Sequence, residues 1–241
     1  MKLKKPIHPN TLIRTFLIVY LPVTILLALV ASVSLINNIP VGIFLRDPAV
    51  IADENLIATI EPNTARYVVP FIGIISNLGI LLWTVSASIC LFCFSIIVRV
   101  NKSLKNENSL FLGSFGLITL FLLLDDLLLF HESIAPNLFI PEQMVYAFYG
   151  AIVLFALVRF RKVILQTEWI ILCLASIFFS LSIGMDIFWL WGDELQLHNF
   201  LEDGFKLLGI ASWVSYFVIT SVGITTNCLN NKEKLISSKD F

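Results

Sequence analysis

Charged residues are scarce in this chain of 241 residues, where Asp, Glu, Lys and Arg together make up 14%. Hydrophobic residues make up 58%, and several apolar runs continue for about 20 residues or more, enough to cross a bilayer as a helix. A soluble domain of this size does not carry such runs. The composition therefore predicts an all-α polytopic membrane protein, whose partner is the lipid bilayer and not a nucleic acid.

Short motifs of common enzyme classes are also missing. Nucleotide-binding glycine loops, the GxSxG elbow of serine hydrolases, the GxSG of rhomboid-type proteases and a basic phosphatase signature are all absent. The four cysteines, Cys90, Cys93, Cys173 and Cys228, lie in or at the end of apolar runs, so we expect packing residues and no disulfide framework. A functional site must therefore be sought among polar residues placed within the apolar runs.

Six apolar segments predict a bundle of six transmembrane helices, which we expect to form one domain over residues 1–241. The longest polar connection is 37–67, where Asp47 and Pro48 predict the start of a short helix. The apolar residues 39–44 of this connection are expected to lie on the membrane surface. The six spans are expected at about 15–36, 68–98, 110–131, 144–158, 168–191 and 203–226.

Basic residues gather at one side of these spans. Thirteen of the 16 Lys and Arg residues fall in the N-terminal segment, the loops 99–109 and 159–168, and the C-terminal tail. The other side has only Arg46 and Arg66, and Lys206 lies within the last span. The positive-inside rule then places both termini in the cytoplasm and the connection 37–67 outside, in a protein of the cell membrane.

Two adjacent acids interrupt the apolar stretch 110–133, which carries Asp125 and Asp126 and ends with His131 and Glu132. An ionised carboxylate in hydrocarbon is costly, so such acids tend to mark a functional site or a buried pair. At about 1.5 Å per residue along a helix, both aspartates lie in the outer third of the bilayer. Asp125 and Glu132 are seven residues apart and are expected to share one face of this helix.

Other spans bring polar side chains to a similar depth. Asp186 lies near the outer end of the fifth span, and Ser76, Asn77 and Lys206 lie near the outer ends of the second and the sixth. Six acids stand against Lys206 as the single base expected to be buried, so protonation, water or a bound cation must balance their charge. These six are Asp125, Asp126, Glu132, Asp186, Glu202 and Asp203. We therefore expect an outward-facing acidic pocket between spans two, three, five and six.

Histidine together with carboxylates suits a divalent transition metal such as zinc. Activation of water by the metal would serve a hydrolase that acts on a lipid or another membrane-embedded substrate. The expected metal ligands are His131, His198, Asp125 and Glu202. The expected catalytic carboxylates are Asp125, Asp126, Glu132 and Asp186, and the expected substrate-binding residues are Ser76, Asn77 and Lys206.

The sequence also permits two functions without catalysis. Asp125, Asp186 and Lys206 could form the relay of a small proton- or cation-coupled transporter, or the acids could bind a partner during membrane assembly. Glu202 also has a structural explanation that requires no functional site, since Asn199 and Glu202 have the spacing of a helix capping box. The sequence leaves open whether the protein is an enzyme, and it does not predict an oligomeric state.

Overall fold

Helices form all the regular structure in this computed structural model, which describes residues 13–14, 16–53, 57, 60, 62–101, 106–188 and 195–237. No strand occurs within these ranges. The prediction of an all-α fold with six helices able to span a membrane is confirmed for this part of the chain. These six stretches, long and apolar enough to cross a membrane, are Phe16–Asn37, Arg66–Val100, Glu107–Leu128, Glu142–Arg159, Trp169–Ile187 and Leu197–Lys232.

The helices begin and end close to the expected positions, with two differences. The third long helix ends at Leu128, earlier than the expected range 110–131, and the last runs over Leu195–Ser237, well beyond the expected range 203–226. In chain order the elements are η1 (Phe16–Tyr20), α2 (Leu21–Asn37), α3 (Gly42–Leu45), α4 (Pro48–Asp53), α5 (Pro62–Val68), η3 (Val69–Phe71), α6 (Ile74–Asn101), α7 (Glu107–Leu128), η4 (Phe130–Ile134), α8 (Ala135–Asn137), α9 (Glu142–Arg159), α10 (Arg161–Ile164), α11 (Trp169–Phe188) and α12 (Leu195–Ser237).

The chain divides into two compact units, which we describe separately. Unit 1 contains Leu82–Leu172 and the part of α12 that begins at Trp213. Unit 2 contains His8–Leu81 together with Cys173–Ser212. Helices α6, α11 and α12 each contribute residues to both units. The expectation of one domain over the whole chain stays a prediction.

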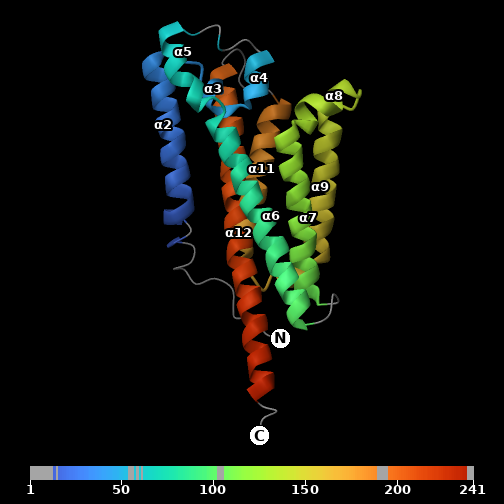
Figure 1. The fold of residues 1–241 in the computed structure, drawn as a ribbon. Coiled ribbons are helices and arrows are strands. Elements are labelled where there is room, and N and C mark those ends of the chain that lie inside the picture. The colour runs from blue at the N-terminus through green and yellow to red at the C-terminus, as the bar shows by residue number, and fades with distance from the viewer. Residues whose placement is uncertain are drawn as a thin grey trace. The chain divides into compact units, whose positions relative to one another are not determined.

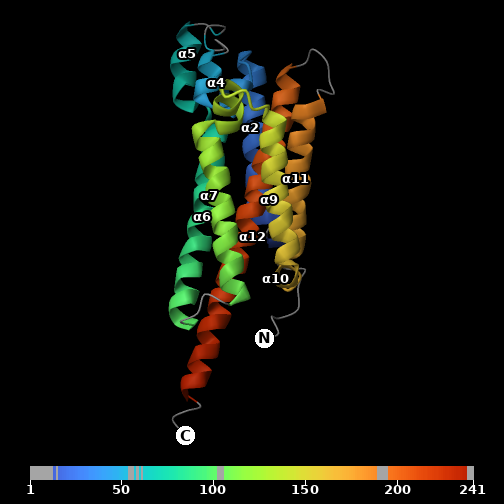
Figure 2. The same ribbon diagram turned by 90° about the vertical axis from the view of Figure 1, so that its right-hand side faces the viewer.

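In unit 1, α7 and α9 run side by side and are connected by η4 and α8 (Figures 1 and 2). A buried aromatic core joins α7 to the second half of α12, since the rings of Phe115 and Phe217 lie 5.1 Å apart and those of Trp213 and Phe217 lie 5.0 Å apart. The Trp213 indole Nε1 donates a hydrogen bond of 3.0 Å to Thr119 Oγ1. This core holds the segment of α7 that leads to Asp125.

Small residues let α6 approach α7 closely. A Cβ atom added to Gly116 would lie 2.8 Å from Leu91 Cδ2, and one added to Gly113 would lie 3.0 Å from Phe94 Cδ2. Both glycines lie on one face of α7, because they are three residues apart. The close approach allows Trp83 of α6 to reach the acidic end of α7.

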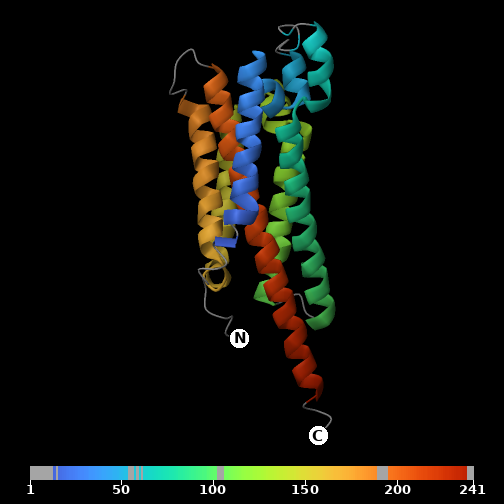
Figure 3. The same cartoon turned by 90° about the vertical axis from the view of Figure 1, so that its left-hand side faces the viewer.

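In unit 2, a buried segment follows α2, which runs beside the first half of α12 (Figure 3). Ile43 and Leu45 of α3 are 0% and 1% exposed within the protein, and the expected place of residues 39–44 on the membrane surface stays a prediction. An apolar segment fits a protein interior as well as a membrane surface, and here it packs inside. The predicted start of α4 is confirmed, since Asp47 Oδ1 accepts a hydrogen bond of 2.8 Å from the Ala49 N–H.

Gly73 forms a backbone hydrogen bond with the buried segment of unit 2. The Gly73 N–H donates a hydrogen bond of 2.9 Å to the Ile43 carbonyl oxygen, and its φ of +62° lies in the left-handed region. A Cβ atom at this position would lie 2.7 Å from Pro48 Cδ. Both the backbone conformation and the crowding therefore require glycine here.

Candidate metal centre

The end of α7 is a sharp turn that folds the chain back on itself. Leu129 has a φ of 50°, in the left-handed region, and its N–H bonds to the Asp125 carbonyl oxygen. A residue with a Cβ atom rarely adopts this conformation, which costs about 1–2 kcal/mol, so the surrounding structure must hold it. Beyond the turn, η4 brings His131 back to Asp125. The expectation that Asp125 and Glu132 share a face of one continuous helix is therefore wrong.

Asp125 and His131 form a buried pair. His131 Nδ1 lies 2.5 Å from Asp125 Oδ2, and the two side chains are 5% and 6% exposed. The other carboxylate oxygen, Oδ1, accepts a hydrogen bond of 3.0 Å from the Tyr149 hydroxyl of α9. An ionised Asp125 can only accept this bond, which requires the proton on Nδ1, and a neutral ring of that tautomer presents Nε2 as its acceptor nitrogen.

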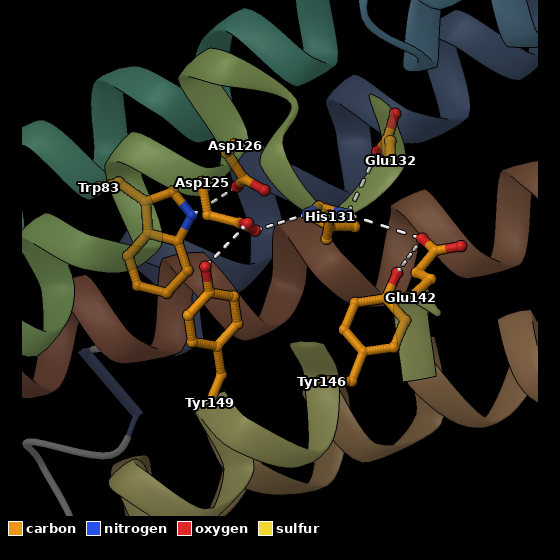
Figure 4. A network of polar contacts seen from close by, with 8 residues as sticks. All are labelled: Trp83, Asp125, Asp126, His131, Glu132, Glu142, Tyr146 and Tyr149. Atoms are coloured by element: carbon orange, nitrogen blue, oxygen red, sulfur yellow. Dashed lines mark hydrogen bonds and ion pairs between the residues drawn. The ribbon is translucent and has the colours of Figure 1, made fainter. Parts of the chain in front are cut away.

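Two glutamates face that second nitrogen (Figure 4). His131 Nε2 lies 3.4 Å from Glu132 Oε1 of η4 and 4.0 Å from Glu142 Oε1 of α9. Their side chains are 34% and 31% exposed, whereas the His131 side chain is 5% exposed. The Tyr146 hydroxyl donates a hydrogen bond of 2.8 Å to Glu142 Oε1, and the rings of Tyr146 and His131 lie 5.3 Å apart.

Asp126 lies on the other side of the cluster. It is half-buried, and its Oδ2 accepts a hydrogen bond of 2.8 Å from Trp83 Nε1 of α6. Asp125, Asp126 and His131 each offer a ligand atom within 4.8 Å of the other two. The cluster thus provides ligand atoms on both sides of the His131 ring.

The distances favour the Nε2 side for a metal ion. Metal bonds to histidine and carboxylate ligands are about 2.0–2.2 Å long, so two ligands of one ion stand about 3–3.5 Å apart. The 2.5 Å between His131 Nδ1 and Asp125 is too short for this and is a hydrogen bond. The 3.4 Å between Nε2 and Glu132 fits, and Glu142 Oε1 lies farther from Nε2, at 4.0 Å. Asp125 then orients the histidine, as carboxylates commonly do behind metal ligands.

The lysine, arginine, aspartate and glutamate positions in the stretch that carries this cluster are all acidic. Residues 110–158 contain four acids, Asp125, Asp126, Glu132 and Glu142, and no lysine or arginine. Four carboxylates close to one histidine repel one another unless a proton or a cation is shared among them. A bound divalent cation would relieve this repulsion.

Unit 2 holds the other predicted site residues in a different setting. His198 Nε2 lies 3.6 Å from Glu202 Oε2, one turn along α12. Arg46, which follows the buried α3, donates a hydrogen bond of 3.0 Å from Nη2 to Asn199 Oδ1. Arg46 and Lys206 both attract the Glu202 carboxylate electrostatically. The sequence-based balance of six acids against Lys206 therefore missed Arg46, which was placed in the outward connection 37–67.

The predicted site residues thus fall into two groups. Asp125, Asp126, His131 and Glu132 come together in unit 1. Asp186, His198, Glu202 and Lys206 belong to unit 2, as do the half-buried Ser76 and the exposed Asn77 at the start of α6. A metal shared by His131, His198, Asp125 and Glu202, and a single pocket that includes Ser76, Asn77 and Lys206, stay predictions.

Sequence reasoning missed three residues of the cluster on α9. Glu142, Tyr146 and Tyr149 are spaced at i, i+4 and i+7, so they form one polar face on an otherwise apolar helix. This spacing could have revealed them. Trp83 carried no such signal, because a tryptophan within an apolar run is usually a packing residue.

Residues 19–220 match the model of a protein family described as a domain of unknown function, DUF8692. The matched range is well over half of the chain and includes every residue of the cluster around His131. Comparison with curated proteins and with solved structures found no match.

Proposed function

This chain belongs to the DUF8692 family, and we propose that it is a multi-pass cell-membrane protein that binds a divalent transition-metal ion in unit 1. Its six candidate spans support the membrane location. The basic residues near the termini and in the loops 99–109 and 159–168 support cytoplasmic ends, because positive charge is retained on that side. The cluster around His131 then faces outward.

The proposed ligands are His131 through Nε2, Glu132 and Glu142. One observation carries this assignment: Asp125 binds Nδ1 at 2.5 Å, which turns Nε2 toward the two glutamates. Tyr149 holds Asp125 and Tyr146 holds Glu142, so hydrogen bonds orient both the histidine and one of the carboxylates. Metal sites depend on such outer hydrogen bonds for their affinity.

Imidazole together with carboxylates suits zinc, iron or manganese more than calcium or magnesium, which prefer oxygen ligands alone. A divalent ion held by three protein ligands keeps an open coordination position and supplies Lewis-acid chemistry that activates water. We propose hydrolysis of a lipid or of another membrane-embedded substrate. Asp126, which Trp83 holds beside the histidine, is the proposed general base.

The direct test is the metal content of protein purified in a mild detergent without a chelator, measured by elemental analysis. We expect stoichiometric zinc, iron or manganese in the wild-type protein, and its loss in His131→Ala and in Glu142→Gln. Glu107→Gln is the matched control, because Glu107 is an exposed acid at the other end of α7 that pairs with Arg159 at 3.7 Å. A wild-type protein without metal would contradict the proposal and favour the transporter or the assembly protein.

A positive result would justify a screen for activity. Lipid esters and amides in mixed micelles are the first substrates to test, with Asp126→Asn as the variant that should keep the metal and lose turnover. Full activity in Asp126→Asn would contradict its role as general base without affecting the metal site.

A further inference from the structure

Three large apolar side chains are exposed in the connection between α8 and α9. They are Leu138, Phe139 and Ile140, which are 60%, 97% and 38% exposed, and we call them the apolar tip. Figure 1 shows α8 projecting sideways beyond the end of α9, so the connection that follows it lies at the edge of unit 1. Neighbouring apolar side chains exposed in this way commonly mark a surface that contacts a protein or a membrane.

Hydrogen bonds hold the backbone of the apolar tip in place. The Phe139 N–H donates to the Pro136 carbonyl oxygen at 2.9 Å. The N–H groups of Ile140 and Leu138 donate to the Ala135 carbonyl oxygen at 2.9 and 3.0 Å. The three apolar side chains are therefore presented from a defined turn.

Phe139 adopts a backbone conformation that disfavours most side chains. Its φ of 61° lies in the left-handed region, which glycine adopts without cost and asparagine more readily than most other residues. Either of these residues would also suit a turn surrounded by water. Phenylalanine at this position is disfavoured both by its backbone and by its exposed ring. A nonaqueous environment around the ring removes the second cost.

The length of α9 places the apolar tip near a membrane surface. The helix has 18 residues and so extends about 27 Å, close to the thickness of a bilayer's hydrocarbon core, about 30 Å. Arg159 at its end is exposed, and Arg161 and Lys162 follow, so we expect this end among the lipid headgroups. Glu142, at the start of α9, then lies near the headgroups of the opposite leaflet. The apolar tip ends two residues before Glu142.

An exposed apolar face of α9 begins close to the apolar tip. Met144, Phe148 and Phe155 are exposed and lie on one side of the helix, because they are spaced at i, i+4 and i+11. In a membrane this face contacts lipid chains. Residues 110–158 contain no lysine or arginine to attract anionic headgroups, so burial of apolar surface is the driving force for lipid contact here.

We propose that the apolar tip inserts into the interfacial region of the lipid leaflet that surrounds the start of α9. Insertion removes the exposed ring of Phe139 from water. It also fixes the depth of Glu142 at the level of the lipid headgroups. The proposal rests on the proposed membrane location and does not depend on the metal ion.

Site-specific fluorescence quenching in liposomes tests the proposal. The dye bimane is attached to Phe139→Cys in a background that carries Cys173→Ala and Cys228→Ala, while the buried Cys90 and Cys93 are kept. Cysteine replaces one side chain with another at the same left-handed position, so the turn should be retained. One quencher is phosphatidylcholine brominated near the glycerol end of its acyl chains, and the other is iodide in the water on both sides of the membrane.

Two labelled positions serve as references. Phe155→Cys lies on the exposed apolar face of α9 and should be quenched by the brominated lipid. Glu107→Cys lies at the exposed polar start of α7 and should be quenched by iodide. We expect Phe139→Cys to approach Phe155→Cys in quenching by the lipid and to be quenched by iodide several-fold less than Glu107→Cys. Leu138→Cys should give the same result as Phe139→Cys.

The other patterns of quenching would overturn the proposal. Strong quenching by iodide and weak quenching by the lipid at Phe139→Cys and Leu138→Cys would place the apolar tip in water. Weak quenching by both would mean that protein, such as a second copy of this chain, covers it. If Phe155→Cys is not quenched by the lipid, the membrane location fails and the proposal with it. Metal content is measured separately, so a failure of the metal site is distinguishable from each of these results.

Discussion

The two units bury acidic side chains in opposite ways. In unit 2, Glu202 is surrounded by charges of both signs, with Arg46 and Lys206 attracting it and Asp186 and Asp203 repelling it. In unit 1, residues 110–158 supply four acids around His131 and no lysine or arginine. Buried charges need compensation. Unit 2 places two fixed cations near Glu202, and burial and the two aspartates oppose their effect. For the acids of residues 110–158, we propose that a bound ligand supplies positive charge.

The histidines of the two units should differ most in metal binding. We expect His131→Ala to abolish stoichiometric metal and His198→Ala to leave it unchanged, because His131 faces Glu132 and Glu142 in its own unit. Elemental analysis of both variants measures the difference. Loss of metal in both would show that His198 and Glu202 share the ion with His131, as the sequence alone suggested.

Replacing the aspartates Asp125 and Asp186 should produce a smaller difference in metal affinity than replacing the two histidines. Asp125→Asn keeps the shape of the side chain but weakens its hold on His131 Nδ1, and changes of this kind usually cost about 10- to 100-fold in metal affinity. Asp186→Asn in unit 2 should leave the affinity unchanged. Competition with a fluorescent zinc chelator measures both values. An unchanged affinity in Asp125→Asn would mean that the orientation of the ring does not matter for the site.

The six long helices were predictable because their apolar runs are long enough to leave no other structure in a bilayer. The start of α4 was predictable because Asp47 and Pro48 are a local signal. The turn at Leu129 was not, because the residues 127–130 are leucines followed by phenylalanine and contain no glycine, asparagine or proline. Tertiary packing imposes this turn, and the geometry of the site depends on it.

Some residues of the site were also predictable from the sequence. Asp125, Asp126, His131 and Glu132 stand out because charged residues are rare in such a run. Their contacts did not follow from helical spacing, since α7 ends and the chain turns at Leu129, between Asp125 and His131. The position of Arg46 was also hidden, because a single arginine in a polar connection gives no sign that the preceding apolar residues are buried.

The stability of unit 2 should depend on Arg46. Arg46→Met removes the hydrogen bond to Asn199 and one of the charges that attract Glu202, so we expect the free energy of unfolding to fall by about 2 kcal/mol. Arg66→Met is the control, because Arg66 is exposed at the end of α5 and its loss should cost about 0.5 kcal/mol or less. If Arg46→Met and Arg66→Met lower the free energy of unfolding in detergent equally, Arg46 does not stabilise the buried acids of unit 2.

The smallest expected effect concerns the left-handed residue Leu129 in unit 1. Replacing Leu129 with glycine or with alanine removes most of its side chain in both cases, but only glycine adopts a φ of 50° without cost. We therefore expect Leu129→Gly to be more stable than Leu129→Ala by about 1 kcal/mol, measured by unfolding in detergent. In an ordinary helix the order is reversed, since glycine costs about 1 kcal/mol relative to alanine. A more stable alanine variant would thus indicate that α7 continues past Leu128, and the contact between His131 and Asp125 would then be lost.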